Sequence, residues 1–141
     1  MARVSTPRPG LVICCKDYRF IQPIQHFVKR RLGIPLYDLK ATAGGVRAML
    51  DAPSIVRKWI MKDIDLVHRL HGIRRIIVVQ HQDCAAYGGS SRFTGPEDER
   101  QFQAVQLQRA KTTLQALCAD TRIDLFFARR RGVRVTLLPI R

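Results

Sequence analysis

Three side chains in the sequence belong to the types that bind transition metals, and they follow two apolar runs. Cys15 comes directly after the run at residues 11–14, and His81 and Cys84 come after the run at residues 75–80. Zinc prefers thiolate and imidazole ligands in tetrahedral geometry, and a catalytic zinc site leaves its fourth position to water. The set therefore predicts a zinc site. The simpler alternative is an inert core thiol at Cys15 and a buried, hydrogen-bonded histidine at His81.

Two charged residues follow Cys15 at a spacing that suits an ion pair. Asp17 and Arg19 are two residues apart, and in an extended or turning segment such residues point the same way. Arg19 can then hold Asp17 through two parallel hydrogen bonds, which keeps the carboxylate ionised. We expect a catalytic role: Asp17 orients a water on the metal, or takes the fourth ligand position itself. A structural salt bridge at a helix start is the alternative.

Strand and helix patterns alternate along the chain and explain how these residues can meet. They predict strands at 11–14, 36–39, 75–80 and 133–138, and helices at 21–32, 53–72 and 94–119. Residues 125–127 are predicted to form a short helical turn or an edge piece, and Trp59 to pack within an apolar stripe. In open parallel sheets, ligands bind outside the carboxyl ends of the strands. Cys15 and His81 therefore face one crevice if the first and third strands are neighbours.

The same alternation predicts an α/β fold, a three-layer sandwich with helices on both faces of the sheet. The central sheet is expected to be mostly parallel, with four to five strands. The 141 residues suit a single domain, with residues 1–9 as a loose arm. Apolar runs are too short to span a bilayer, and the N-terminus lacks the apolar core of a secretory signal. We expect a cytoplasmic protein with reduced cysteines.

The chain is strongly basic, which leaves two interpretations open. It has 25 Lys and Arg residues against 11 Asp and Glu residues, a formal net charge of +14. Such a charge favours nucleic-acid binding through phosphate contacts, or it is a solvated surface that favours anionic substrates. The basic residues are spread along the chain except for the run at residues 129–131, and no nucleic-acid-binding motif accompanies them.

The two chemistry-bearing segments together resemble a known family. Residues 15–19, Cys-Lys-Asp-Tyr-Arg, resemble the Cys-x-Asp-x-Arg motif of the β-class carbonic anhydrases, and residues 81–84 resemble their His-x-x-Cys motif. The resemblance covers about residues 11–118. It implies a zinc ion held by Cys15, His81 and Cys84, with Asp17 and Arg19 governing the fourth position. It also implies a homodimer or higher oligomer whose cleft is completed near the subunit interface.

The sequence departs from the family pattern beside the expected cleft. The family carries Arg-Asn-Ala-Gly-Asn after its second strand, whereas residues 41–45 read Ala-Thr-Ala-Gly-Gly, so that only Ala43 and Gly44 match. Ala85 replaces the glycine that usually follows the last zinc cysteine. The substrate pocket is expected to include Ala43, Gly44 and Gly45, and Tyr87 is a further candidate for its wall.

The resemblance implies hydration of carbon dioxide to bicarbonate by a zinc-bound hydroxide. Two alternatives stay open beside it. One is hydrolysis of a related small carbon–sulfur compound at the same site. The other is a non-catalytic or regulatory relative that keeps its zinc and binds a partner or nucleic acid through its basic surface.

Overall fold

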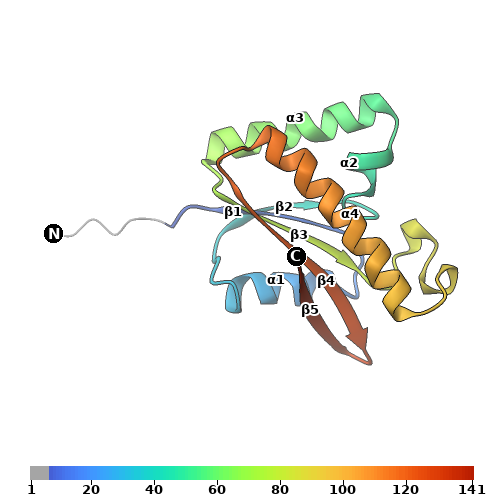
Figure 1. Cartoon of the computed structure of the whole chain (residues 1–141). Helices are drawn as coiled ribbons and strands as arrows, with labels where there is room; N and C mark the ends of the chain where they lie inside the picture. Colours follow the sequence, from blue (N-terminus) through green and yellow to red (C-terminus); the bar gives the residue numbers. More distant parts are fainter. Residues whose placement is uncertain (1–6) are drawn as a thin grey trace.

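Apolar runs in the sequence form the inner strands of one five-stranded sheet (Figure 1). The computed structural model describes residues 7–141. The strands lie in the order β2-β1-β3-β4-β5, and all neighbours are parallel except β4 and β5. Their bounds are β1 Gly10–Cys14, β2 Tyr37–Ala41, β3 Arg75–His81, β4 Arg122–Arg131 and β5 Arg134–Ile140.

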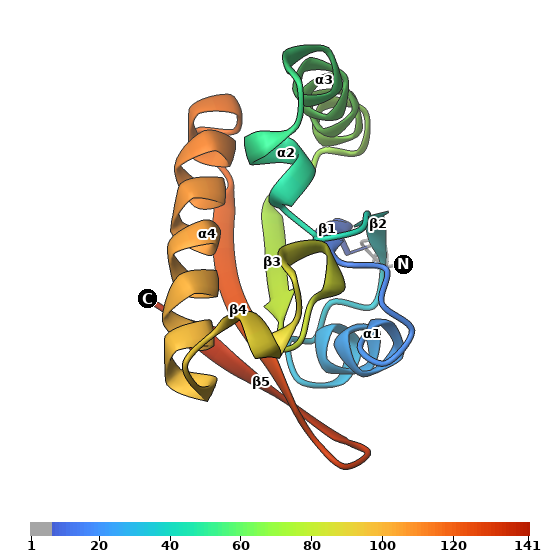
Figure 2. The ribbon, with the colours of Figure 1, turned by 90° about the vertical axis from the view of Figure 1, so that its right-hand side faces the viewer.

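Helices cover both faces of this sheet. They are α1 Ile21–Arg30, α2 Arg47–Asp51, α3 Ser54–His71 and α4 Pro96–Leu117. Figures 1 and 2 show α2, α3 and α4 on one face and α1 on the other. The predicted three-layer, mostly parallel α/β architecture is confirmed. The predicted helices and strands occur within a few residues of their expected bounds, and α2 is an additional short helix.

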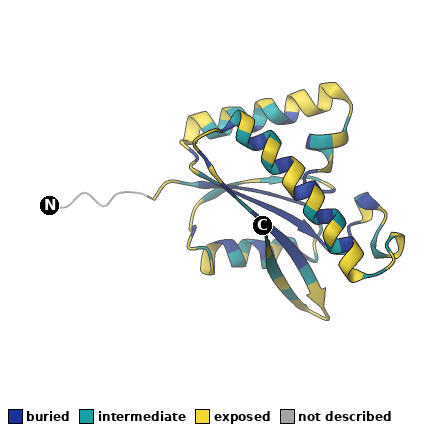
Figure 3. Cartoon of the chain, viewed as in Figure 1, coloured by how far each residue is buried: buried dark blue, intermediate teal, exposed yellow. Residues whose placement is uncertain are grey.

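Two apolar layers hold the sheet between the helices. Leu11 and Ile13 of β1 pack toward α2, α3 and α4, while Val12 and Cys14 pack toward α1. A strand covered on both faces needs apolar side chains at every position, which explains why the β1 and β3 runs show no alternation. Figure 3 shows these inner strands as buried and the outer helix surfaces as exposed.

The prediction for residues 125–127 is wrong. They belong to β4, an inner strand that pairs with β3 on one side and β5 on the other. Phe127 is only 2% exposed, and Leu125 is buried on the α4 face. Both ends of this strand are polar and extend past the core: Arg122 at one end and the basic run at residues 129–131 at the other. The apolar centre of the strand is therefore too short to be recognised as a strand from the sequence.

The prediction that Trp59 packs in the core is also wrong. Ile60 and Ile64 are the α3 residues that enter the core, whereas Trp59 is 64% exposed and Ile55 is 78% exposed. The ammonium group of Lys40 lies 4.5 Å from the Trp59 ring centroid, a cation–π contact at the surface. The apolar stripe of α3 is therefore wider than the face that the sheet covers.

Most of the predicted loose arm, residues 1–6, lies outside the described residues. Residues 7–9, which complete it, belong to no helix or strand. In the described part of the chain, no helix has both the length and the apolar character needed to cross a membrane.

Candidate metal centre

The carboxyl ends of β1 and β3 meet at one edge of the sheet. The two strands are parallel neighbours, with Ile13 opposite Val78. Cys15 follows β1 directly, and His81 is the last residue of β3. Asp83 has a left-handed backbone conformation with φ of 58°, which turns the chain so that Cys84 comes back beside His81. The expectation that the first and third predicted strands are neighbours in the sheet is confirmed.

The structure brings the three predicted ligands together in a buried cluster. Candidate ligand atoms of Cys15, His81 and Cys84 all lie within 4.8 Å of one another. All three residues are buried, at 6%, 2% and 3% exposure respectively. A tetrahedral site with metal–sulfur bonds of ~2.3 Å separates its ligand atoms by just under ~4 Å, so small side-chain rotations bring these atoms onto one ion.

The His81 ring supports a metal ion at this position. Its Nδ1 lies 2.7 Å from the carbonyl oxygen of Gln82, and a carbonyl can only accept, so Nδ1 carries the hydrogen. Nε2 is left as an acceptor. Among the buried side-chain nitrogen and oxygen atoms of the described residues, this one alone has no hydrogen-bond partner. Leaving a buried polar atom unpaired is costly. A metal ion between the two thiols would satisfy this lone pair.

The cysteines of the cluster differ in proton affinity. Hydrogen bonds from the Cys84 thiol and the Gly44 N–H lower the pKa of Cys15 to about 4. The Gly44 nitrogen lies 3.4 Å from the Cys15 sulfur. The shared hydrogen bond and burial raise the pKa of Cys84. The cluster thus holds one thiolate at neutral pH, and thiolates are the form that binds metals.

Cys14 faces away from this cluster. It is fully buried in the layer beneath α1, and burial raises its pKa to about 12. A neutral, buried thiol is a core residue and not a ligand. Adjacent cysteines therefore take opposite roles because successive side chains of a strand point to opposite faces.

Asp17 and Arg19 form the expected ion pair beside the cluster. The Arg19 Nη2 donates to Asp17 Oδ2 at 2.7 Å and Nε donates to Oδ1 at 3.1 Å. These hydrogen bonds lower the pKa of Asp17 to about 2, so the carboxylate is ionised. Its Oδ2 lies 3.9 Å from the free Nε2 of His81. The carboxylate thus stands at the open side of the three ligands.

A cavity of about 430 Å³ opens over the cluster. Its lining includes Cys15, Asp17 and Cys84 together with Ala43 and Gly44, which are two of the expected pocket residues. Ala85 and Ala86 add further small apolar surface. The cleft wall therefore has small residues on one side, and the rest of its lining includes Lys16, Tyr18 and Arg19.

The other two expected pocket residues lie beneath the wall. An added Cβ on Gly45 would meet the side-chain oxygen of Gln80 at 2.1 Å, so this glycine packs tightly against β3. Tyr87 is 7% exposed, and its hydroxyl accepts a hydrogen bond from Gln80 at 3.4 Å. Neither residue is part of the cavity lining. They support the wall from behind.

Gln80 anchors the altered glycine loop. Its side-chain oxygen accepts from the Val46 N–H at 3.1 Å, and its amide donates to the Gly44 carbonyl at 3.1 Å and to Gln103 at 3.0 Å. Gln80 and Gln103 are 2% and 1% exposed. These bonds hold the loop where the Gly44 N–H reaches Cys15. Within the loop, the Thr42 hydroxyl also donates to the Gly45 carbonyl at 2.9 Å.

A second, partly buried network fixes the turn between His81 and Cys84. Arg19 also donates to Asp83 Oδ2 at 2.9 Å and to the Asp83 carbonyl oxygen at 2.9 Å. The Asp83 N–H donates to Glu99 at 2.8 Å, and the Ser90 hydroxyl donates to the other Glu99 oxygen at 2.8 Å. One arginine thus couples both ligand-bearing segments. The sequence contained no local signal for Gln80, Asp83 or Glu99.

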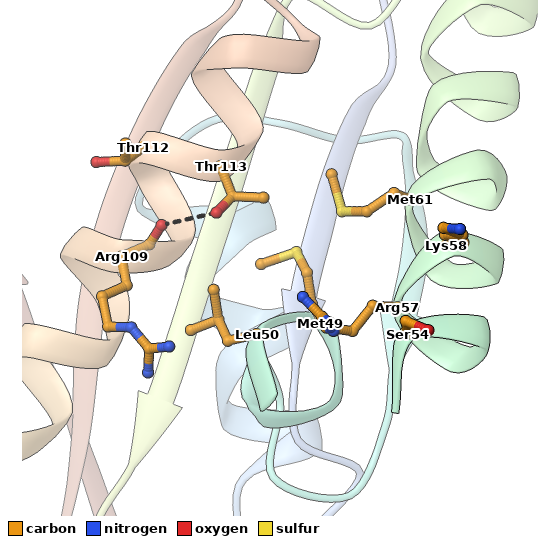
Figure 4. A pocket seen from close by; sticks show the side chains of 9 residues that line it. All are labelled: Met49, Leu50, Ser54, Arg57, Lys58, Met61, Arg109, Thr112 and Thr113. Atoms are coloured by element: carbon orange, nitrogen blue, oxygen red, sulfur yellow. Dashed lines mark hydrogen bonds between the residues drawn. The ribbon is translucent and has the colours of Figure 1, made fainter. Parts of the chain in front are cut away.

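A larger cavity, about 580 Å³, lies away from the cluster between α2, α3 and α4 (Figure 4). Its lining combines apolar Met49 and Met61 with basic Arg57 and Arg109. The Arg109 guanidinium is already paired with Asp51 at 2.9 Å. None of the predicted site residues lines this cavity.

Comparisons with known proteins agree with this geometry. The chain matches the family model for putative carbonic anhydrases over residues 6–136. An uncharacterised protein of Rickettsia conorii is 26% identical over 128 residues, covering 87% of this chain and 68% of that protein.

Two solved structures share the fold. The carbonic anhydrase of Streptococcus mutans has a TM-score of 0.58 at 16% identity, covering 97% of this chain and 87% of that chain. The β-carbonic anhydrase isoform I of Trichomonas vaginalis has a TM-score of 0.55 at 13% identity, covering 99% of this chain and 87% of that chain.

The family match includes both ligand-bearing segments, residues 15–19 and 81–84. The resemblance to carbonic anhydrases that these segments suggested is confirmed, and the low identities fit a divergent member. The chain belongs to the putative carbonic anhydrase family.

Proposed function

We propose that the protein binds one zinc ion through Cys15, His81 and Cys84 and hydrates carbon dioxide to bicarbonate. The observation that carries the proposal is the unpaired Nε2 of His81, buried between two cysteine sulfurs. Two sulfurs and one imidazole are a donor set that zinc prefers, and three protein ligands leave room for chemistry at the fourth position. The family and the fold agree with this assignment.

The residues around the cluster have separate roles in this reaction. A bound zinc ion would supply Lewis acidity toward water at neutral pH. Asp17 is ionised and held by Arg19, so it can accept a hydrogen bond from a water at the open side and orient it. Ala43 and Gly44 of the cleft wall offer a small, largely apolar surface against which carbon dioxide fits.

The active form is a homodimer or a higher oligomer built on the outer surface of α3. Ile55, Trp59 and Leu70 of α3 are 78%, 64% and 69% exposed. Large apolar residues gathered on one surface mark an interaction site. A second copy of the chain is the proposed partner, and each copy forms a single domain.

A stopped-flow assay of carbon dioxide hydration tests the proposed activity. In zinc-loaded protein, Asp17→Asn is expected to lower kcat by at least about 100-fold, the usual contribution of a proton-handling side chain. The control is Asp65→Asn, which removes a carboxylate from the surface pair with Arg69 and should leave kcat unchanged. A small carbon–sulfur substrate is assayed in parallel.

Two outcomes would overturn the proposal. One is zinc-loaded wild type that does not exceed the buffer rate. The other is a rate that Asp17→Asn leaves unchanged. Turnover of the carbon–sulfur compound alone would move the substrate assignment to that class while keeping the site.

A further inference from the structure

The end of the β4–β5 hairpin is the most concentrated basic feature of the described chain. Arg129, Arg130 and Arg131 end β4, and Arg134 begins β5 after the two-residue turn. Figures 1 and 2 show this hairpin extending beyond the rest of the molecule. Val133 at its tip is 93% exposed. The hairpin therefore carries four guanidinium groups on a narrow, projecting ribbon.

These arginines have no paired counter-charge within residues 7–141. No ion pair between described residues includes any of the four, although Arg19, Arg75 and other arginines of the chain are paired. Arg131 lies directly opposite Arg134 in the strand register, and like charges in that position destabilise a hairpin. Repulsion between these arginines destabilises the hairpin, and an anionic partner bound to the hairpin would relieve the repulsion.

The shape of the ribbon limits the class of partner. The major groove of B-form DNA admits a two-stranded β-ribbon, and guanidinium groups pair with phosphates and guanine edges. The major groove of A-form RNA is too narrow for such an element. Binding of single strands relies on aromatic stacking, and the hairpin residues include no aromatic side chain between 128 and 137.

We propose that the β4–β5 hairpin is a binding element for duplex DNA, held by phosphate contacts from Arg129, Arg130, Arg131 and Arg134. The net charge of +14 adds a favourable long-range field. The backbone N–H of Arg130 donates to the Gln82 side chain at 3.0 Å, which ties the end of β4 to the turn after β3. This activity is independent of the reaction proposed for the metal centre.

Salt-dependent binding of the full-length protein to a 20-base-pair duplex tests the proposal. Four phosphate contacts give a slope of log K against log salt of about −3.6, or about 150-fold weaker binding between 50 and 200 mM salt. Replacing Arg129, Arg131 and Arg134 by alanine should leave a slope of about −0.9, or about fourfold. The corresponding lysine variant should retain most of the slope.

A matched variant separates the hairpin from the overall charge. Arg8, Arg74 and Lys111 lie away from the hairpin, and replacing these three by alanine removes the same net charge while leaving the slope close to wild type. An unchanged near-ultraviolet circular dichroism spectrum shows that each variant is folded.

Three results would overturn the proposal. These are no saturable duplex binding at 50 mM salt, an equal loss of slope in the two alanine variants, or tighter binding to single-stranded DNA, duplex RNA or phosphatidylserine vesicles than to duplex DNA.

Discussion

Cys15 and Cys84 share a hydrogen bond, yet they hold their protons with opposite strength. The pKa of Cys15 is lowered to about 4 and that of Cys84 is raised. At pH 7 Cys15 is therefore already a thiolate, and Cys84 must lose its proton when a metal ion binds. Metal binding should release about one proton per chain at pH 7 and weaken about tenfold for each unit that the pH falls toward 6.

Calorimetric titration of zinc in buffers of different ionisation enthalpy measures this proton count. Cys118→Ala is the control, because Cys118 is buried outside the cluster and should not alter the count. Release of no proton, or of two, would contradict the assignment of one thiolate to the free cluster.

The candidate ligands could be predicted from the sequence, whereas the residues that hold them in place could not. Cys15 and His81 could be predicted because apolar runs fix the strand ends and parallel strands end at the same edge. Gln80 and Glu99 act through partners that are distant in the chain, such as Gln103 and Asp83. Such polar contacts have no periodicity and depend on the completed fold.

The contact between Gly45 and Gln80 gives a measurable consequence. Gly45 and Gly72 have the same left-handed φ, 60° and 61°, but an added Cβ meets Gln80 only at Gly45. Gly72→Ala should cost about 1–2 kcal/mol of unfolding free energy from backbone strain. Gly45→Ala adds the crowding and should cost at least about 3 kcal/mol, as measured by urea unfolding. If the two substitutions lowered the free energy of unfolding equally, Gln80 would have to leave room for a side chain at position 45.

At the scale of elements, the alternation of strands and helices was predictable because each apolar run or stripe is long enough to show its period. Strand β4 was missed since only its centre is apolar and its basic end resembles a solvated loop. The short helix α2 has five residues, less than two turns, and that length gives no readable period.

The position of β4 inside the sheet predicts a strong response to truncation. Phe127 is 2% exposed between the helix layers, so Phe127→Ala should lower the free energy of unfolding by about 3–5 kcal/mol. Val133→Ala in the same hairpin removes an exposed side chain and should change it by less than about 0.5 kcal/mol. Denaturant titrations compare the two, and similar small effects would contradict an inner strand.

At the scale of the whole molecule, the exposed apolar surface of α3 predicts self-association. Trp59→Lys places a charge at its centre and should shift the sedimentation coefficient of the protein toward that of a monomer. Val105→Lys alters an equally exposed apolar residue on α4 and should leave the assembly intact. A wild type that sediments as a monomer across a concentration series would exclude this interface.

Both proposed activities depend on separate parts of the chain, with the metal centre at the strand ends and the basic residues on the projecting hairpin. The central claim is the metal centre, and zinc content by mass spectrometry after exhaustive dialysis tests it most directly. We expect about one zinc per chain in the wild type, because two thiolates and an imidazole hold the ion tightly, and little zinc in Cys84→Ser or His81→Ala. Less than about half an equivalent in the wild type, or full retention in either variant, would contradict the account.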